Sequence, residues 1–491
     1  TRLRVLALYF YPNKVAAARA RFLQAGVYGS RIAVHHVESY AKLPFVGRFA
    51  NLIVSEDVVT NGRTVGDAAE VFRALRPNGG MLCLGQPAGS GAPLEREALS
   101  AWWAETGLDA TWSSSPDGEW FTAVRPELEG AGEWSHLYGR ADNSAFGGES
   151  LGGASTTSEM TVQWIGRPGP RAQPDRNGRK PSPLSTSGRL FVQGLHRIIA
   201  VDAFNGSILW SLEIPALERF NMPRDCSNWC ADDDHVYLAV KDRCWQIDAA
   251  TGDVMTMFPV VPSERNDWEY EWGYIARTES QLIGSSEKAE SAFTSYWGDA
   301  DAGWYDARSG PATFKVCSDS LFALNPRTGE RNWSYENGVI INSTITVSAD
   351  RAYFVESRSR EMKQSPSRRT GAAELWDDQY LVALDLQSGA VVWEEPIDTA
   401  DGTVVFYLAD GDGTLIVDAS TDSKFEVTAF QSSDGKPLWR QEFGWFENKG
   451  AHGKAISRPA IVGGRVYVRP KVLDLASGEV LDIEMPKGKC G

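Results

Sequence analysis

Acidic side chains that could bind a cation lie close together near residue 300. Asp299, Asp301 and Asp306 could offer oxygen ligands to Ca²⁺. Their spacing lacks the glycine and the distal glutamate of an EF-hand loop, so the sequence supports no definite metal site. His35 and His36 alternate in direction at a strand end, without a cysteine, aspartate or third histidine at ligand spacing. We therefore interpret both histidines as structural.

Aromatic side chains gather at Trp268, Tyr270 and Trp272, in a segment rich in tryptophan, tyrosine and acids. Such rings could stack on a flat cofactor or on a sugar. The alternative, which we favour, is that they fill a hydrophobic seam between sheets.

The six cysteines are too few for a disulfide framework. Cys226 and Cys230 are close enough to bridge across a loop, which would fit an extracytoplasmic location, and two unpaired thiols are the alternative. No C-x-x-C-H motif occurs, so we expect no covalent haem on this chain.

A hairpin phrase organises most of this chain. In ALDLQSGAVVW, from Ala383 to Trp393, an apolar run ends in Asp385, a short turn reaches Gly389 and a second apolar run ends in tryptophan. The aspartate can bond the turn backbone, the glycine can take the positive φ that the turn needs, and the indole can pack against a neighbouring sheet. The phrase therefore predicts a β-hairpin with one apolar face.

Six copies of this phrase occur, of which the copies that start at Gln246 and Val472 lack the tryptophan and the copy with Gln431 lacks the aspartate. Its turn glycines are Gly206, Gly252, Gly329, Gly389, Gly435 and Gly478. They are separated by 46, 77, 60, 46 and 43 residues. A period in the forties, built from short strands and turns, is typical of a propeller with one four-stranded sheet per repeat. The two longer gaps predict insertions at Val261 to about Thr313 and at Ser357 to about Leu375.

The pattern A-x-D-x-x-[TS]-G-x-x-x-W resembles the repeat of the PQQ-like, or quinoprotein-type, β-propellers, over residues 188–491. The resemblance implies a ring of seven or eight blades. With six repeats visible, further blades are expected beyond residue 491 or in a degenerate repeat within the 77-residue gap. Residues 134–146 resemble the entry segment of such propellers, which commonly completes the last blade.

The same resemblance bears on cofactors. Quinoprotein dehydrogenases carry adjacent cysteines over the quinone, together with Ca²⁺ ligands and a catalytic aspartate. This sequence has no adjacent cysteine pair. PQQ and Ca²⁺ are therefore possible but unsupported, and no residue is assigned as catalytic, cofactor-binding or metal-binding.

Alternating strand and helix patterns fill residues 1–128. Continuous apolar runs at 3–10 and 50–55 predict buried parallel strands, and amphipathic helices follow them. The phrases LIVSED and EVFRALRPNGGML resemble a class I S-adenosylmethionine methyltransferase domain, which is a Rossmann-type α/β fold. Tyr9 stands where that family carries a ribose-binding acid, and Glu38 lies near its adenine contact. The family's opening strand and Gly-rich loop would precede Thr1, so we expect a partial domain without cofactor.

Composition limits the classes of function. A net charge of −15 disfavours general nucleic-acid binding. No run of 18 apolar residues occurs, so no transmembrane helix is expected. Arg167, Arg171, Arg176, Arg179 and Lys180 form a basic, proline-rich stretch that is either an anion- or partner-docking loop or, as we favour, a solvated connector.

Together these patterns predict a mainly β protein in three parts. Residues 1–128 form the partial α/β domain, 129–187 the linker and entry segment, and 188–491 the blades. The leading hypothesis is an extracytoplasmic (periplasmic or cell-surface) binding or scaffold module with protein partners. The alternatives are a quinoprotein-like dehydrogenase that oxidises an alcohol or sugar, and an S-adenosylmethionine-dependent methyltransferase.

Overall fold

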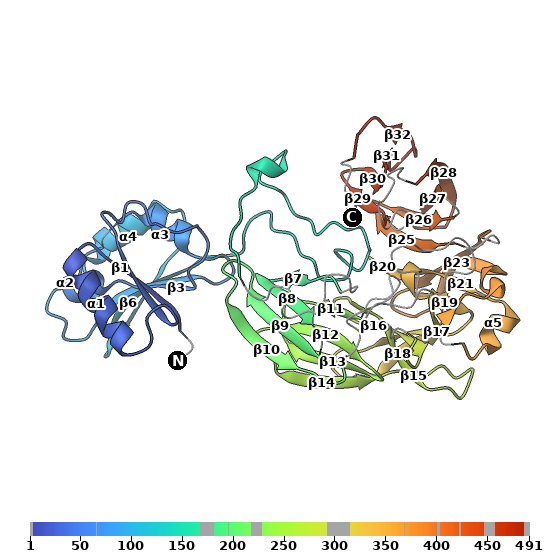
Figure 1. Ribbon diagram of the computed structural model, residues 1–491, viewed down its shortest axis with the longest axis horizontal. Coiled ribbons are helices and arrows are strands. Elements are labelled where there is room, and N and C mark those ends of the chain that lie inside the picture. Colours follow the sequence, from blue (N-terminus) through green and yellow to red (C-terminus); the bar gives the residue numbers. More distant parts are fainter. Residues whose placement is uncertain are drawn as a thin grey trace. The chain divides into compact units, whose positions relative to one another are not determined.

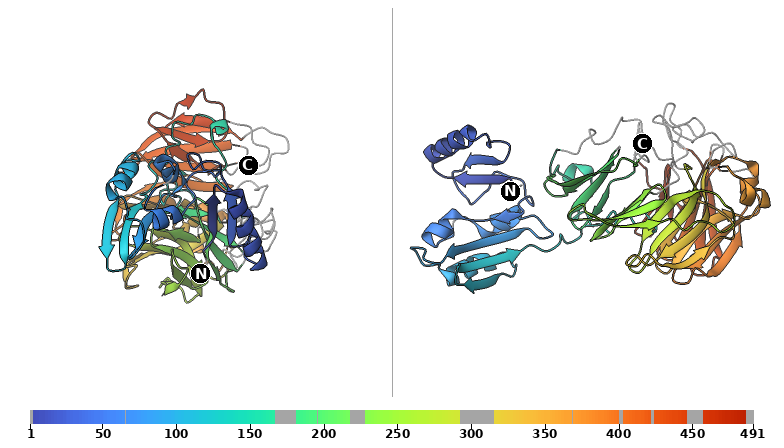
Figure 2. Two further views of the ribbon diagram at one scale, coloured as in Figure 1. Left: turned by 90° about the vertical axis from the view of Figure 1, so that its left-hand side faces the viewer. Right: turned by 90° about the horizontal axis from the view of Figure 1, so that it is seen from below.

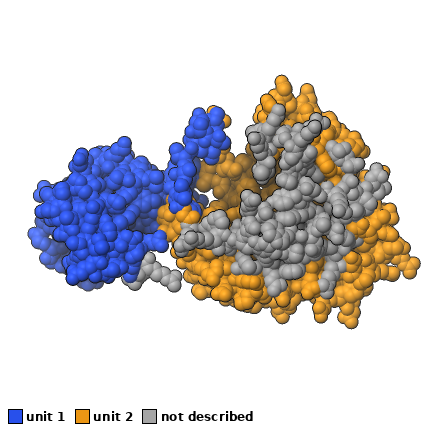
Figure 3. All heavy atoms as spheres, in the orientation of Figure 1, with its two compact units in different colours: residues 1–129, 156–165 blue, residues 130–155, 166–491 orange. Residues whose placement is uncertain are grey.

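The computed structural model describes residues 3–64, 66–166, 181–194, 196–217, 228–291, 315–367, 369–399, 403–421, 424–445 and 457–485. The chain divides into two compact units, coloured separately in Figure 3. The first unit comprises residues 1–129 and 156–165, and the second comprises residues 130–155 and 166–491.

The first unit is an α/β domain. Its elements are β1 (Val5–Tyr9), α1 (Pro12–Gln24), β2 (Ile32–His36), β3 (Leu52–Ile53), α2 (Glu56–Asn61), α3 (Ala68–Ala74), β4 (Met81–Pro87), α4 (Arg96–Ala104), β5 (Thr111–Ser115), β6 (Gly118–Val124) and the 3₁₀ turn η1 (Thr157–Glu159). The side chains of Ser55 and Asp67 cap α2 and α3, as expected from residues that bond free N–H groups at a helix start. Leu82, Leu84, Leu99 and Trp103 lie at the centre of its core.

The strands of this unit form two sheets instead of the single parallel sheet that the sequence predicts. β1 and β2 pair in parallel as a two-stranded sheet, and the other sheet has the order β3-β4-β6-β5. Figure 2 shows the two sheets as separate ribbons. The prediction that β1 is buried is wrong, because Val5 and Leu6 are 43% and 47% exposed. β5 and β6 form an antiparallel hairpin, and β6 pairs antiparallel to β4.

The described residues of the second unit form six consecutive antiparallel blades, which follow one another from green to red in Figure 1. Blade 1 has β7 (Leu184–Thr186), β8 (Arg189–Gly194), β9 (Arg197–Asp202) and β10 (Ile208–Glu213); blade 2 has β11 (Trp229–Ala231), β12 (His235–Val240), β13 (Arg243–Asp248) and β14 (Val254–Pro259). Blade 3 has β15 (Tyr270–Arg277), β16 (Leu282–Lys288), β17 (Lys315–Leu324) and β18 (Arg331–Tyr335).

In blade 4 the first strand is broken by a 3₁₀ turn. This blade has β19 (Val339–Ile341), η5 (Asn342–Thr344), β20 (Thr346–Ser348), β21 (Arg351–Ser357), β23 (Gln379–Asp385) and β24 (Val391–Pro396), and β19 also pairs with β17 of blade 3. Blade 5 has β25 (Val405–Gly411), β26 (Thr414–Ser420), β27 (Lys424–Gln431) and β28 (Pro437–Gly444); blade 6 has β29 (Ala460–Val462), β30 (Arg465–Val468), β31 (Lys471–Asp474) and β32 (Val480–Leu481). A seventh or eighth blade stays a prediction.

Each repeated glycine lies in the turn between the third and fourth strands of its blade. Asp385 accepts hydrogen bonds from the backbone N–H and the hydroxyl of Ser388, at 2.8 and 2.6 Å, and Gly389 has φ 71°. This geometry is the one that the hairpin phrase predicts.

A repeated tryptophan connects blades 1, 3, 4 and 5 to the blade that follows each of them, whereas between blades 2 and 3 Phe258 lies against Gly329 instead. Trp333 Nε1 donates to the Leu386 carbonyl at 2.8 Å, and Trp393 Nε1 donates to the Ser432 carbonyl at 3.0 Å. A Cβ atom on Gly389 would lie 2.7 Å from the Trp333 indole, and one on Gly435 would lie 2.6 Å from the Trp393 indole. The glycine is therefore required twice, for its backbone conformation and for the ring that lies on it. Trp210 and Trp439 bond and stack in the same way.

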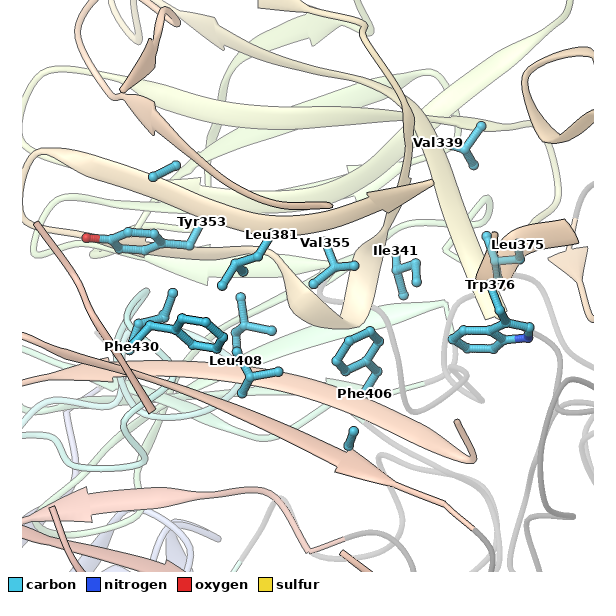
Figure 4. Close-up of a cluster of buried hydrophobic side chains, with 14 of the residues drawn as sticks. Val339, Ile341, Tyr353, Val355, Leu375, Trp376, Leu381, Phe406, Leu408 and Phe430 are labelled. Carbon is cyan, nitrogen blue, oxygen red and sulfur yellow. The ribbon is translucent and has the colours of Figure 1, made fainter. Parts of the chain in front are cut away.

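Hydrophobic clusters between adjacent blades form the core of this unit. Figure 4 shows the cluster between blades 4 and 5, where Tyr353, Val355 and Leu381 face Phe406 and Leu408. These side chains are at most 3% exposed, and full burial of such residues contributes about 1.5–3 kcal/mol each. Burial of each sheet thus depends on its neighbour.

The structure corrects the predicted insertion at 261–313. β15 and β16, which lie inside it, are the first two strands of blade 3. The turn phrase marks only the third and fourth strands, so a long connection between β16 and β17 resembled a longer insertion. The insertion at 357–375 is confirmed, and contains α5 (Arg360–Gln364), β22 (Arg369–Thr370) and the 3₁₀ turn η6 (Ala373–Trp376).

Candidate interaction face

The two ends of the blades differ in what they carry. In an antiparallel blade, the turn from strand 1 to strand 2 and the turn from strand 3 to strand 4 lie at the same end of the sheet. The connection from strand 2 to strand 3 lies at the opposite end. The connections between β16 and β17 and between β21 and β23 both follow second strands. They therefore leave the blades at one end, which we call the insertion end; the other is the turn end.

Residues 134–146, which we call the central segment, lie at the turn end and contact the blades in chain order. Trp134 exchanges two backbone hydrogen bonds of 2.8 Å with Ser185 of blade 1, and Ser135 accepts from the Ala231 N–H of blade 2 at 2.9 Å. His136 Nε2 accepts from the Arg277 N–H of blade 3 at 3.2 Å. The central segment thus spans the first three blades with three consecutive residues.

The same segment continues across the remaining blades. The carbonyl groups of Ala141, Asp142 and Ser144 accept from the N–H groups of Val347, Asp410 and Ile461, in blades 4, 5 and 6, at 2.9, 2.9 and 2.8 Å. All six bonded positions belong to the first strands of their blades. Since one short segment reaches all six, these strands surround a common centre, as the propeller prediction requires.

Two side chains of the central segment have fixed hydrogen-bonding roles. Asn143 Nδ2 donates to the Ile345 carbonyl and to Thr346 Oγ1 at 3.0 and 2.9 Å. His136 is buried, which lowers its pKa to about 3, so its ring is neutral. Because Nε2 accepts, Nδ1 carries the proton and donates to Ser135 Oγ at 2.8 Å.

The central segment does not complete the last blade, in contrast to what the resemblance implies. Among the described residues, β29–β32 alone form blade 6. One to three hydrogen bonds to each of the six blades replace the continuous pairing to one blade. No sequence periodicity marks such a segment, because each residue meets a different partner.

A network of charged residues lies at the insertion end of blade 4. Arg358 bonds Glu394 in a bidentate pair at 3.0 and 2.6 Å, and its Nε donates to Glu356 at 2.8 Å. Glu356 is fully buried, which raises its pKa, and it also accepts from the Tyr335 hydroxyl at 2.8 Å. The Arg358 guanidinium lies 4.0 Å from the Tyr380 ring centre. Such stacking and bidentate pairing fix the guanidinium in place.

Blade 3 contributes a second charged group at this end. Asp319 accepts from the Tyr270 hydroxyl at 2.9 Å and lies 3.7 Å from Lys288 Nζ. Lys288 in turn lies 4.5 Å from the Trp268 ring centre. Burial, and then the nearby Arg265 guanidinium, lowers the pKa of Lys363 in α5. Cations and acids from both blades thus pair with one another at the insertion end, where Glu394 is 40% exposed and the other paired side chains are largely buried.

A buried acid between blades 5 and 6 has no such partners. Asp418 is fully buried, and neither carboxylate oxygen has a hydrogen-bond partner within the described part of the chain. Burial raises its pKa well above the usual value, against the opposing effect of Arg458. The Arg458 guanidinium lies between the rings of Tyr138 and Tyr407, 3.9 and 4.0 Å from their centres.

The predicted aromatic group separates into two environments. Trp272 is fully buried between blades 2 and 3, where its Nε1 donates to the Phe258 carbonyl at 3.1 Å and its ring meets Phe322 edge-on. Tyr270 and Trp268 belong to the charged group described above. The prediction that Trp272 packs in a hydrophobic seam between sheets is therefore confirmed.

The other candidate residues are placed as follows. His36 Nε2 lies 3.0 Å from the Phe10 carbonyl, and the His35 ring meets Phe45 edge-on, so both have structural contacts. The Tyr9 hydroxyl lies 3.5 Å from Glu56, and Glu38 is exposed. Asp299, Asp301, Asp306, Cys226 and the basic stretch at 167–180 lie outside the described residues.

Two further observations concern metals and membranes. Within the described ranges, no three His, Cys, Asp or Glu side chains are grouped so that they could hold a metal ion. No helix in those ranges is long and apolar enough to span a bilayer.

The blades, their glycine turns and their interlocking tryptophans define a PQQ-like β-propeller. The family profile described as "Outer membrane protein assembly factor BamB" matches residues 161–336, 315–421 and 377–488. The chain belongs to this family.

Two relatives carry the same description. The protein of Burkholderia pseudomallei is 24% identical over 183 residues, which are 35% of this chain and 42% of the relative. That of Xanthomonas campestris is 33% identical over 87 residues, 17% of this chain and 20% of the relative. The matched part thus spans less than half the length of either relative.

Solved structures with similar folds include propellers of two kinds. BamB from Moraxella catarrhalis is 13% identical with a TM-score of 0.34, over 63% of this chain and 75% of that one. A quinohemoprotein alcohol dehydrogenase from Pseudomonas putida is 13% identical with a TM-score of 0.39, over 71% of this chain and 50% of that one. Both scores are low, so the fold assignment rests on strand pairing and on the family match.

Proposed function

We propose that this protein is an extracytoplasmic scaffold that binds protein partners during assembly of outer membrane proteins, and that the insertion end of blades 3 and 4 is its docking face. The family match along the blades carries this proposal. The relatives' description supplies the assembly role.

The different contacts at the two ends of the blades support the choice of the insertion end as the docking face. At the turn end, the central segment uses its own polar groups to bond the blades. At the insertion end, charged groups on both blades lie beside connections that differ from blade to blade. Binding residues concentrate on such connections, which a rigid scaffold positions.

Site-specific photo-crosslinking in cells tests the proposal. A photoreactive residue at Arg360, exposed in α5 at the insertion end, should crosslink to a component of the outer membrane assembly machinery. The matched control is Lys436, whose side chain is 77% exposed in a 3–4 turn. Crosslinks at neither position, or equally at both, would contradict the proposed face.

The charge network gives a second arm of the same test. Glu394→Gln, which leaves the contact between Arg358 and Glu356 in place, should weaken the crosslink from Arg360. The thermal stability of this variant is measured as well, because a loss caused only by misfolding would lower it.

For the first unit we propose a degenerate methyltransferase-like domain without cofactor. Two parallel pairs of strands followed by an antiparallel hairpin support this. Calorimetric titration with S-adenosylmethionine should give no heat.

Quinone absorbance in an extract of the purified protein would instead favour the dehydrogenase alternative.

A further inference from the structure

The outer strand of blade 2 differs from the outer strands of the other blades. β14 reads VMTMFP and contains no charged residue. Four of the other outer strands contain acidic or basic residues, which are Glu213 in β10, Arg331 in β18, Glu394 and Glu395 in β24, and Arg440 and Glu442 in β28. The fifth, β32, has only two residues. Charged side chains and short length keep sheet edges from pairing with other chains, and β14 has neither.

Apolar side chains of β14 face solvent. Val254, Met255 and Met257 are 37%, 59% and 44% exposed. Thr256 stands where the hairpin phrase carries its tryptophan, and Phe258, which is 2% exposed, fills the seam with blade 3. The methionines are therefore not needed for the packing of blade 2 on blade 3. Exposed apolar side chains on an open edge are typical of an interaction site, and flexible thioethers adapt readily to a partner.

The hydrogen-bond register shows which backbone groups of this edge are open. Within the described residues, β14 pairs only with β13. The Val260 N–H donates to the Asp242 carbonyl at 2.8 Å, and residues of an antiparallel strand alternately bond the neighbour and point away from it. Phe258 and Thr256 therefore bond β13, and Met257 between them directs its N–H and C=O outward.

We propose that β14 pairs antiparallel with β14 of a second copy of this chain, about a two-fold axis at Met257. The two Met257 residues then exchange both N–H···O bonds, and Thr256 of each copy lies opposite Phe258 of the other. Pro259, which has no N–H, limits the pairing on its side of the axis.

The chemistry of the edge favours a second copy as the occupant. A strand that adds here must have an open edge, no charge and apolar side chains that cover the methionines, and β14 itself meets all three requirements. Pairing about a two-fold axis brings a residue on the axis opposite its own copy, where like charges are destabilising. In a chain with a net charge of −15, an uncharged edge is therefore the one where two copies can approach.

The size of the contact sets its strength. A single pair of short strands buries less than the roughly 800 Å² per partner that a stable protein interface buries. We therefore expect a weak dimer, in equilibrium with the monomer, whose Kd lies on the order of 10–100 µM.

Sedimentation equilibrium of the purified chain, from roughly 1 to 500 µM, tests the proposal and should show monomer and dimer in exchange. Met257→Lys should raise the Kd of the dimer by roughly tenfold or more, because two ammonium groups would meet at the axis. Leu438→Lys is the matched control, because Leu438 is 45% exposed in the outer strand β28, and it should change the Kd by less than about twofold.

A mixing experiment tests the two-fold axis itself. Met257→Lys mixed with Met257→Glu should associate about as tightly as the parent chain, because opposite charges then face each other, whereas each variant alone should not. Both variants should melt like the parent chain, since Met257 is exposed in the monomer. A chain that stays monomeric over this range, a dimer that Met257→Lys leaves intact, or variants that do not associate when mixed would overturn the proposal.

Discussion

At the scale of single residues, His136 couples the central segment to pH. Its pKa of about 3 lies below the ordinary value, so the folded protein favours the neutral ring. The unfolded chain binds a proton at this histidine near about pH 6.5, whereas the folded chain does so only near pH 3. The free energy of unfolding is therefore highest above about pH 6.5 and decreases as the pH falls from there towards 3.

We therefore predict that His136→Gln reduces the acid sensitivity of the fold. The glutamine carbonyl can keep the bond from the Arg277 N–H but cannot titrate. Between pH 7.5 and 5 the free energy of unfolding should fall by about 2 kcal/mol less in the variant than in the parent protein. Denaturant unfolding at both pH values measures this, and identical pH dependence in the two proteins would contradict it.

The stacking of tryptophan on glycine gives a second prediction. Gly435→Ala should destabilise the protein by about 2 kcal/mol more than Gly413→Ala. Both glycines have a positive φ of about 75°. A Cβ atom at Gly435 would meet the Trp393 indole, whereas a Cβ atom at Gly413 would have no other heavy atom of the described structure within 4 Å. In a Trp393→Ala background the difference should disappear; its persistence would place the strain elsewhere.

At the scale of elements, the central segment should determine how firmly the first strands are held. Asn143→Ala removes two buried hydrogen bonds from a residue with φ 57° and should cost about 3 kcal/mol. The amides of Val347 and Ile461 should then exchange faster. Ser144→Ala, in the same segment, is the matched control, because the only described bonds of its hydroxyl lie within the segment. Equal effects of the two variants would contradict this role.

The elements also show how far the sequence could predict the structure. In the copy at Asp385, Gly389 and Trp393 the three characteristic residues lie within one short phrase, so even imperfect copies of it marked each of the six described blades. The extent of blade 3 was not predictable, because β15 and β16 carry no such phrase. The charged contacts of Arg358 with Glu394 and of Lys288 with Asp319 join distant segments, so no local spacing indicates them.

At the scale of the whole molecule, the two units have separate hydrophobic cores. Leu84 belongs to a cluster formed only by the first unit, and Leu408 to one formed only by the blades. We predict two unfolding transitions, with Leu84→Ala lowering one and Leu408→Ala the other, each by about 2–5 kcal/mol. Differential scanning calorimetry measures both; a single transition shifted by either variant would show that the units unfold together.

The central segment also limits how this architecture can change in evolution. Its backbone groups and the His136 ring meet blades 1 to 6 in the order in which they are synthesised, and the Asn143 side chain adds two bonds to blade 4. Gene duplication of a blade would add a sheet for which this segment has no residue in reach. The length of the segment therefore limits the number of blades that it can contact, and an inserted blade would be tolerated only if residues 134–146 lengthened with it.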